Sequence, residues 1–221
     1  MQSTVKRRRY YSPQREHQAQ ATRQQILDAA TRLFVRDGYF GATIEAIAQD
    51  AGVAAATVYA TFSTKRAILA ALVDAAVFGA DPPGTRASER TWYHELANEP
   101  DARRALHGWG AYLCEVNARV APIQRVVQSA ATSDPVMAEL WQRLKDQRFD
   151  GQSAAAHLFA ERQVLRAGLS ETEAADILYV LSDAHVYETC VHERGWSPAK
   201  LAEWLGDTLC ALLLPVTTWP S

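Results

Sequence analysis

The sequence predicts an all-α protein in which a small N-terminal helical domain precedes a larger helical body. Apolar residues recur at the three-and-four spacing of amphipathic helices from Ile26 almost to the C-terminus. Helix-start signals punctuate that pattern, among them Asp134-Pro135 and the capping box that runs from Ser170 to Glu173. No segment shows the strict alternation of a half-buried strand. Helices are therefore the only regular structure expected.

Composition divides the 221 residues into three parts. Residues 1–19 are polar, basic and rich in glutamine, which predicts a disordered arm. Residues 20–72 form the first domain, which is expected to be a three-helix unit followed by a fourth helix that begins near Lys65. Residues 73–221 form the body, which a Pro- and Gly-rich linker at 79–88 introduces. The body should end in two long apolar helices over about 171–193 and 198–214.

Two short helices inside the first domain have the pattern of a helix-turn-helix. They cover about 44–51 and 54–61, and the turn between them is Ala51-Gly52-Val53, where the glycine permits a sharp bend. Such a unit places its second helix in the major groove of DNA. The residues expected to contact DNA are the outward face of the second helix and the starts of the two flanking helices: Thr43, Ala55, Ala56, Thr57, Tyr59, Ala60, Thr61 and Lys65.

The charge distribution supports a polyanionic partner for the N-terminal end. Residues 1–70 hold ten Lys and Arg against five Asp and Glu, whereas the remainder holds 13 basic and 20 acidic residues. A basic end on an acidic body is typical of a protein that binds nucleic acid with that end alone. The cluster Lys6–Arg9 could follow phosphates or enter a minor groove, or it could be a solvated tail; the sequence leaves both open.

The stretch Thr22–Ala71 resembles the DNA-binding domain of the TetR family of regulators. The resemblance is carried by Ile26-Leu27, Ala29-Ala30, Leu33-Phe34, Gly38-Tyr39, Thr43, Ile47-Ala48, Ala51-Gly52-Val53, Thr57-Val58-Tyr59, Phe62 and Lys65. Two features differ from the family pattern: Ala42 replaces a common threonine, and alanines occupy reading-helix positions that are often polar. Base readout is therefore expected to use apolar contacts, water or DNA shape.

The resemblance implies that the body is a ligand-binding and dimerisation domain. Its last two helices would pair with those of a second copy, so the operator would be a near-palindrome of double-stranded DNA. A small-molecule inducer would occupy a cavity lined by aromatic and apolar side chains with a few polar groups. The candidates are Trp109, Tyr112, Leu113, Val116, Trp141, Phe159, Tyr179 and Asp183.

The sequence gives little support for catalysis, cofactor binding or metal binding. It has no Gly-rich phosphate loop and no Gly-x-Ser-x-Gly, and its three cysteines lie among apolar residues, so we expect no catalytic site and no cofactor. His185, Glu188 and His192 share a helix face, but we interpret them as a polar stripe and expect no metal. A cytoplasmic location is expected because no secretory signal or membrane-spanning run is present.

Three functions are compatible with these features. The first is a dimeric, ligand-responsive repressor that an inducer releases from its operator. The second is a helical small-molecule binding protein or enzyme that merely retains the helix-turn-helix. The third is an activator or architectural DNA-binding protein without an inducer, whose body should contain no cavity of roughly 300 Å³.

Overall fold

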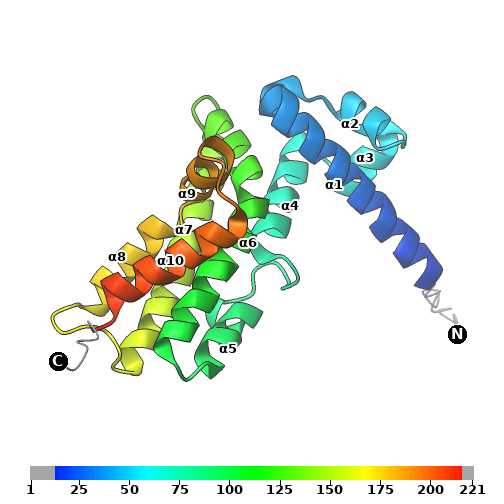
Figure 1. The fold of residues 1–221 in the computed structure, drawn as a ribbon. Coiled ribbons are helices and arrows are strands. Elements are labelled where there is room, and N and C mark those ends of the chain that lie inside the picture. Colours follow the sequence, from blue (N-terminus) through cyan, green and yellow to red (C-terminus); the bar gives the residue numbers. More distant parts are fainter. Residues whose placement is uncertain (1–12, 216–221) are drawn as a thin grey trace, which may run out of the picture.

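The computed structural model describes residues 13–215, and within that range all regular structure is helical (Figure 1). This confirms the predicted fold class. The α-helices are α1 (Pro13–Gly41), α2 (Ile44–Asp50), α3 (Ala55–Phe62), α4 (Lys65–Phe78), α5 (Thr91–Asn98), α6 (Ala102–Ala131), α7 (Pro135–Glu161), α8 (Glu171–Leu181), α9 (Ala184–Tyr187) and α10 (Pro198–Leu213). A 3-10 helix, Ala87–Glu89, precedes α5, and a π-helix, Glu188–Glu193, follows α9.

Helix α1 begins earlier than the sequence pattern predicts. The prediction of a disordered arm over residues 1–19 is wrong for residues 13–19, which form the first turns of α1. Their exposed side chains include Gln, Arg and Ala, which favour helix, and Pro13 occupies the first turn, where its missing N–H costs nothing. The N-terminal end of α1 projects from the molecule in Figure 1. The cluster Lys6–Arg9 lies outside the described residues.

The small domain forms around the buried faces of α1 to α4. Thr43 and Thr64 cap α2 and α4, and each hydroxyl oxygen accepts a bond of 3.1 Å from a backbone N–H three residues on. Gly52 has φ +68° and makes the predicted bend between α2 and α3. Helix α4 does not stop at the predicted boundary of residue 72 but continues to Phe78, so one rigid element joins the small domain to the body.

Helix α6 is shared by two hydrophobic cores. Its N-terminal half packs in the body core with α5, α7, α8 and α10, whereas its C-terminal half, including Ile123 and Val127, packs against α1 and α4. Pro122 lies between the two halves and lacks the N–H that would bond to the Ala118 carbonyl. One helix therefore contacts both domains.

The predicted single helix over 171–193 is wrong, because the chain breaks at Ser182-Asp183. Asp183 Oδ1 accepts a 2.8 Å bond from the His185 N–H and so caps a new helix, α9. Asn117 Nδ2 donates to the Ser182 carbonyl at 3.2 Å, which holds the break against α6. The local bond of Asp183 competes with helix continuation, and the Asn117 bond adds a tertiary contact at the break. The final helix is confirmed, as α10 spans nearly the predicted range.

Candidate nucleic-acid interface and ligand cavity

Helix α3 presents a smooth outward face to solvent. Ala56, Tyr59 and Ala60 are exposed, and Tyr59 keeps 48% of its surface accessible. Ala55, Thr57 and Thr61 are half-buried, and the Thr61 hydroxyl donates to the Thr57 carbonyl at 2.8 Å. Val58 and Phe62 are buried on the opposite side and fix the helix to the domain core. The exposed alanines would let the helix approach a major-groove floor closely.

Lys65 has a different setting from the one predicted for a phosphate contact. Its Nζ donates to the carbonyl oxygens of Tyr39 and Ala42, each at 2.7 Å, and lies 4.6 Å from the centre of the Tyr39 ring. Burial lowers the pKa of the Lys65 ammonium. The side chain thus holds the end of α1 to the start of α4. Thr43 is likewise committed as the cap of α2, although its hydroxyl proton stays available.

A cavity of about 80 Å³ lies in the body between α6 and α7, with α5 at its side. Four of the predicted ligand-binding residues line it: Trp109, Tyr112, Leu113 and Val116, all on α6. These residues follow one another at helical spacing and share the inward face of α6. The structure therefore brings together the α6 half of the predicted set.

The other four predicted residues do not line this cavity. Phe159 is fully buried in the body core, and Trp141 packs against the core of the small domain. Tyr179 and Asp183 lie behind the lining residue Arg148, whose guanidinium carbon is 4.1 Å from the centre of the Tyr179 ring and whose Nη1 pairs with the Asp183 carboxylate. Asp183 and Tyr179 therefore position Arg148.

Polar lining residues were missed by the sequence reasoning. They are Arg90, Asn117, Gln124, Gln147, Arg148, Gln152 and Ser182, and the aromatic residue Trp92 was missed with them. A signal did exist, because Asn117 and Gln152 interrupt apolar helix faces and are 6% and 5% exposed. Polar side chains at core positions of long helices would have identified this site.

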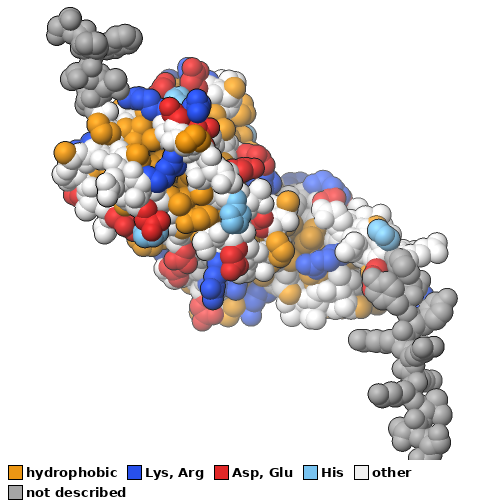
Figure 2. Space-filling view, turned by 90° about the horizontal axis from the view of Figure 1, so that it is seen from below, with side chains coloured by type: hydrophobic (Ala, Val, Ile, Leu, Met, Phe, Trp, Pro, Cys, Tyr) orange, Lys and Arg blue, Asp and Glu red, His pale blue; other side chains and the backbone are white. Residues whose placement is uncertain are grey.

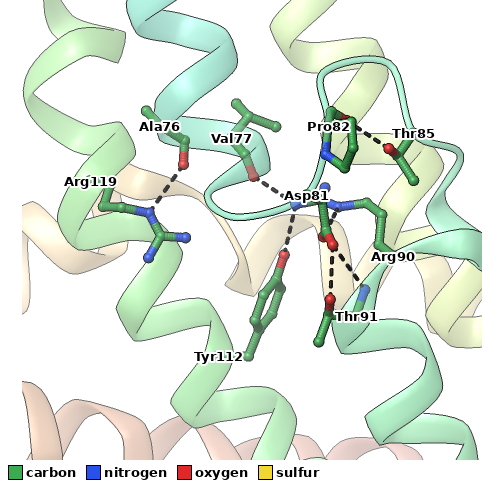
Figure 3. A network of polar contacts seen from close by, with 9 residues as sticks. All are labelled: Ala76, Val77, Asp81, Pro82, Thr85, Arg90, Thr91, Tyr112 and Arg119. Atoms are coloured by element: carbon green, nitrogen blue, oxygen red, sulfur yellow. Dashed lines mark hydrogen bonds and ion pairs between the residues drawn. The ribbon is translucent and has the colours of Figure 1, made fainter. Parts of the chain in front are cut away.

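Arg90 connects the cavity wall to the end of α4 (Figure 3). Its Nη2 donates to the Val77 carbonyl at 2.7 Å and to the Tyr112 hydroxyl at 3.3 Å, while its Nε lies 3.3 Å from Asp81 Oδ2. Asp81 also accepts bonds from the Thr91 N–H and hydroxyl. Burial raises the pKa of Tyr112 to about 12, so its hydroxyl stays protonated. The network joins α4, the linker, α5 and α6.

Three aromatic rings form one wall of the cavity. The ring centres of Trp92 and Trp109 are 4.7 Å apart, and Trp109 stacks on Tyr112 at 5.0 Å. Among the described residues, five buried side-chain nitrogen or oxygen atoms have no hydrogen-bond partner. Four of them belong to lining residues: Trp92 Nε1, Trp109 Nε1, Arg148 Nε and Gln152 Oε1. Most buried polar groups in proteins are paired, so the unpaired atoms of the described residues are concentrated among the residues that line this cavity.

The residues considered for metal binding or covalent chemistry do not form a comparable site. In the described part of the chain, no three His, Cys, Asp or Glu side chains cluster as metal ligands would, and Glu188 is ion-paired with Arg125 at 3.1 Å. Burial raises the pKa of Cys114 to about 11, which keeps its thiol protonated. Between residues 13 and 215, no helix is long and apolar enough to cross a membrane.

The described residues thus join a helix-turn-helix domain to a helical body that contains a cavity. Residues 26–72 match the family model of bacterial regulatory proteins, tetR family. This match covers the helix-turn-helix domain and does not extend into the body. No curated protein matches the sequence.

Solved structures share the fold over most of the chain. NalD, the secondary repressor of the MexAB-OprM multidrug efflux pump in Pseudomonas aeruginosa, is 21% identical with a TM-score of 0.68, covering 92% of this chain and 100% of its own. The SmeT–triclosan complex has the same identity and TM-score, with 89% and 93% covered. FadR from Bacillus subtilis in complex with stearoyl-CoA is 18% identical with a TM-score of 0.65, with 84% and 96% covered.

Proposed function

We propose that the protein is a dimeric transcriptional repressor that leaves a near-palindromic operator when a small molecule binds its body. The observation that carries this proposal is the joint presence of a helix-turn-helix and a cavity whose lining residues include four unpartnered buried polar atoms. Similar structures support it, since one is a repressor and two hold small molecules, triclosan and stearoyl-CoA. We infer a cytoplasmic location, where the operator is.

The cavity favours this function over the two alternatives. The volume of about 80 Å³ is below the roughly 300 Å³ expected of an inducer cavity, so volume does not separate the repressor from an architectural DNA-binding protein; the unpartnered polar groups on the lining residues favour the repressor. A binding protein that merely retained the helix-turn-helix would not need to join the cavity to that domain. Here the Arg90 network and α6 both make that connection.

We infer that the signal passes through α4 and α6. Arg90 bonds to the Val77 carbonyl at the end of α4 and to Tyr112 in the cavity wall, and Arg119 of α6 donates to the Ala76 carbonyl at 3.4 Å. A ligand that moves Tyr112 or Arg90 shifts the end of α4 and hence the small domain. The ligand acts only through different affinities for the two arrangements.

Dimerisation would place two reading helices on one face of the DNA. Helices α8 and α10 pack against each other and expose Val180, Trp204 and Leu212, which are 66%, 39% and 39% accessible. Figure 2 shows hydrophobic side chains gathered on the surface of the body among charged ones. We propose that the α8–α10 face joins two copies, so that the half-sites lie about one helical turn of DNA apart.

The direct test is binding to the DNA upstream of the protein's own reading frame, measured by fluorescence polarisation at low and moderate salt. The variant Ala56→Asp places a carboxylate on the exposed reading face, near the start of α3 where the helix dipole tolerates it. We expect operator affinity to fall at least about tenfold, because the carboxylate would face phosphates.

The matched control is Val136→Asp, which adds the same charge at an exposed position of α7. It should leave operator affinity within about twofold of the wild type. Equal loss in both variants, or no preference of the wild type for this DNA over scrambled DNA, would contradict the proposal.

A further inference from the structure

The core of the helix-turn-helix domain carries no net charge. Residues 26–70 hold four Lys and Arg against four Asp and Glu, whereas residues 1–25 hold six Lys and Arg against the single acidic residue Glu16. The basic excess of residues 1–70 therefore belongs entirely to the first 25 residues. Because affinity for the phosphates of duplex DNA depends on positive charge, the domain core alone is a poor source of it.

The basic side chains of the domain core are also engaged within the chain. Lys65 bonds to two backbone carbonyls of the small domain. The three arginines form ion pairs of 2.6 to 3.5 Å: Arg32 with Asp50, Arg36 with Asp37 and Arg66 with Asp134. A cation beside a carboxylate presents little net charge to a phosphate, because the two fields largely cancel at a distance.

The N-terminal turns of α1 have a free surface. Residues 14–21 are all exposed, and in Figure 1 these turns extend past α3 on the side away from the body. Most helices in proteins are stabilised by packing of one face, but no residue of this stretch is buried. Arg15 lies in these turns and forms no ion pair with another described residue. Its charge is therefore available to a partner.

Arg23 fixes where these turns begin relative to α3. Its guanidinium carbon lies 4.4 Å from the centre of the Phe62 ring, and Phe62 is the last residue of α3 and is buried. Arg15 precedes Arg23 by eight residues, so the helical rise places it about 12 Å further along α1. With α3 in a major groove about 12 Å wide, the duplex backbone that borders the groove lies within reach of these turns.

We infer that the N-terminal turns of α1 form a second DNA contact, in which Arg15 binds a phosphate outside the base pairs that face α3. The partner is the backbone of duplex DNA, so this contact is independent of base sequence. The inference rests on the proposed function for the identity of the partner. It adds that the phosphate-binding charge lies on α1, before the residues that the family model matches.

The test measures binding of the full chain to the upstream DNA and to a scrambled duplex, by fluorescence polarisation over a series of salt concentrations. Arg15→Gln should reduce the slope of log affinity against log salt by about 0.9 for each chain bound, the value for one phosphate contact. The reduction should be equal on the two duplexes, because phosphates carry no sequence information. An unchanged slope overturns the inference.

Arg36→Gln is the matched control, because it removes the same charge from an exposed position of α1 where the cation is paired with Asp37. Its slope should stay within about 0.3 of the wild-type value. Ala19→Arg in the Arg15→Gln background returns a cation one turn along the same face of α1 and should restore most of the lost slope. Equal flattening by Arg15→Gln and Arg36→Gln would reduce the effect to net charge and overturn the inference.

The two duplexes separate this inference from the proposed function. Equal wild-type binding to both, with a slope that Arg15→Gln reduces, contradicts the repressor and leaves the α1 contact standing. Preference for the upstream DNA, with a slope that Arg15→Gln leaves unchanged, contradicts only the α1 contact. If Arg15→Gln left the slope unchanged and lowered the mass measured by light scattering, the turns would bind a second copy of the chain and the inference would fail.

Discussion

Lys65 shows how one side chain can hold two helices of a reading domain together. Its ammonium bonds to two carbonyls at the end of α1, so Lys65→Met would leave both without that partner. We expect the free energy of unfolding to fall by about 1–2 kcal/mol, measured by urea denaturation. The slope of operator affinity against salt should stay that of the wild type, because the charge is used inside the domain.

The neighbouring Arg66→Met is the control for that change. Arg66 makes a surface ion pair with Asp134 at 3.5 Å, and such pairs contribute little. Its loss should cost less than about 0.5 kcal/mol. If Lys65→Met were equally mild and flattened the salt slope instead, Lys65 would be a phosphate contact, as its sequence position first indicated.

Asp183 gives the body a dependence on pH. Burial raises the pKa of this carboxyl, but bonds from the His185 N–H and the Arg148 guanidinium lower it more, so the pKa lies below the ordinary 3.8. A depressed carboxyl pKa contributes stability above pH 3.8 that is lost as the pH falls through the folded-state pKa. Asp183→Asn keeps a good helix cap but removes the charge.

Urea denaturation over a pH series measures this contribution as the difference in stability between the wild type and Asp183→Asn. The difference should be steady near neutral pH and shrink below pH 3.8. A difference that stays constant into that acid range would show that the carboxylate contributes no charge-dependent stability.

At the residue scale, the sequence predicts which face of a helix a side chain occupies better than it predicts how deeply that side chain is buried. Helical spacing correctly puts Trp109 and Tyr112 on the cavity side of α6. The same spacing cannot tell Phe159, which is sealed in the core, from a residue at the cavity edge, because both lie on an inward face. The sequence does not identify Arg148 as a cavity residue, because its position depends on a bond to Asp183, which lies 35 positions away.

At the scale of elements, helices α6 and α10 cross where Gly110 of α6 lies against Gly206 of α10. A Cβ on Gly110 would lie 2.7 Å from the Ala202 carbonyl oxygen and 2.9 Å from the Gly206 nitrogen. Gly110→Ala must therefore push α10 away from α6, and we expect a loss of about 1–3 kcal/mol in unfolding free energy.

Gly108, on the same helix, provides the matched control. A Cβ there would meet nothing within 4 Å, so Gly108→Ala should stabilise the protein by about 0.5–1 kcal/mol through helix propensity alone. Far-UV circular dichroism in urea measures both variants. Effects of the same sign would contradict a close crossing at Gly110.

Element boundaries follow from the sequence wherever a local signal sets them. The Asp134 and Ser170 caps start α7 and α8 where predicted, because each cap bonds within its own first turn. The break before α9 depends partly on Asn117, which is 65 positions from Ser182, and apolar periodicity continues across it. Tertiary bonds of that kind leave no local pattern in the sequence.

At the scale of the whole molecule, the proposed dimer would determine whether two copies of α3 can contact one operator. The exposed apolar residues Val180 and Leu212 lie on the paired helices α8 and α10. The double variant Val180→Asp with Leu212→Asp would bury four carboxylates in a symmetric interface of two copies, which is strongly unfavourable. We expect light scattering to give the mass of one chain, 24.4 kDa, where the wild type gives twice that value.

The same double variant should lose at least about tenfold in operator affinity, because a single reading domain forfeits the gain from two linked contacts. Its far-UV spectrum should remain that of the wild type, since both positions are on the surface of the single chain. Val136→Asp, an exposed apolar position on α7, controls for added charge and should stay dimeric. A double variant that still dimerises and binds the operator would place the interface on another face of the body.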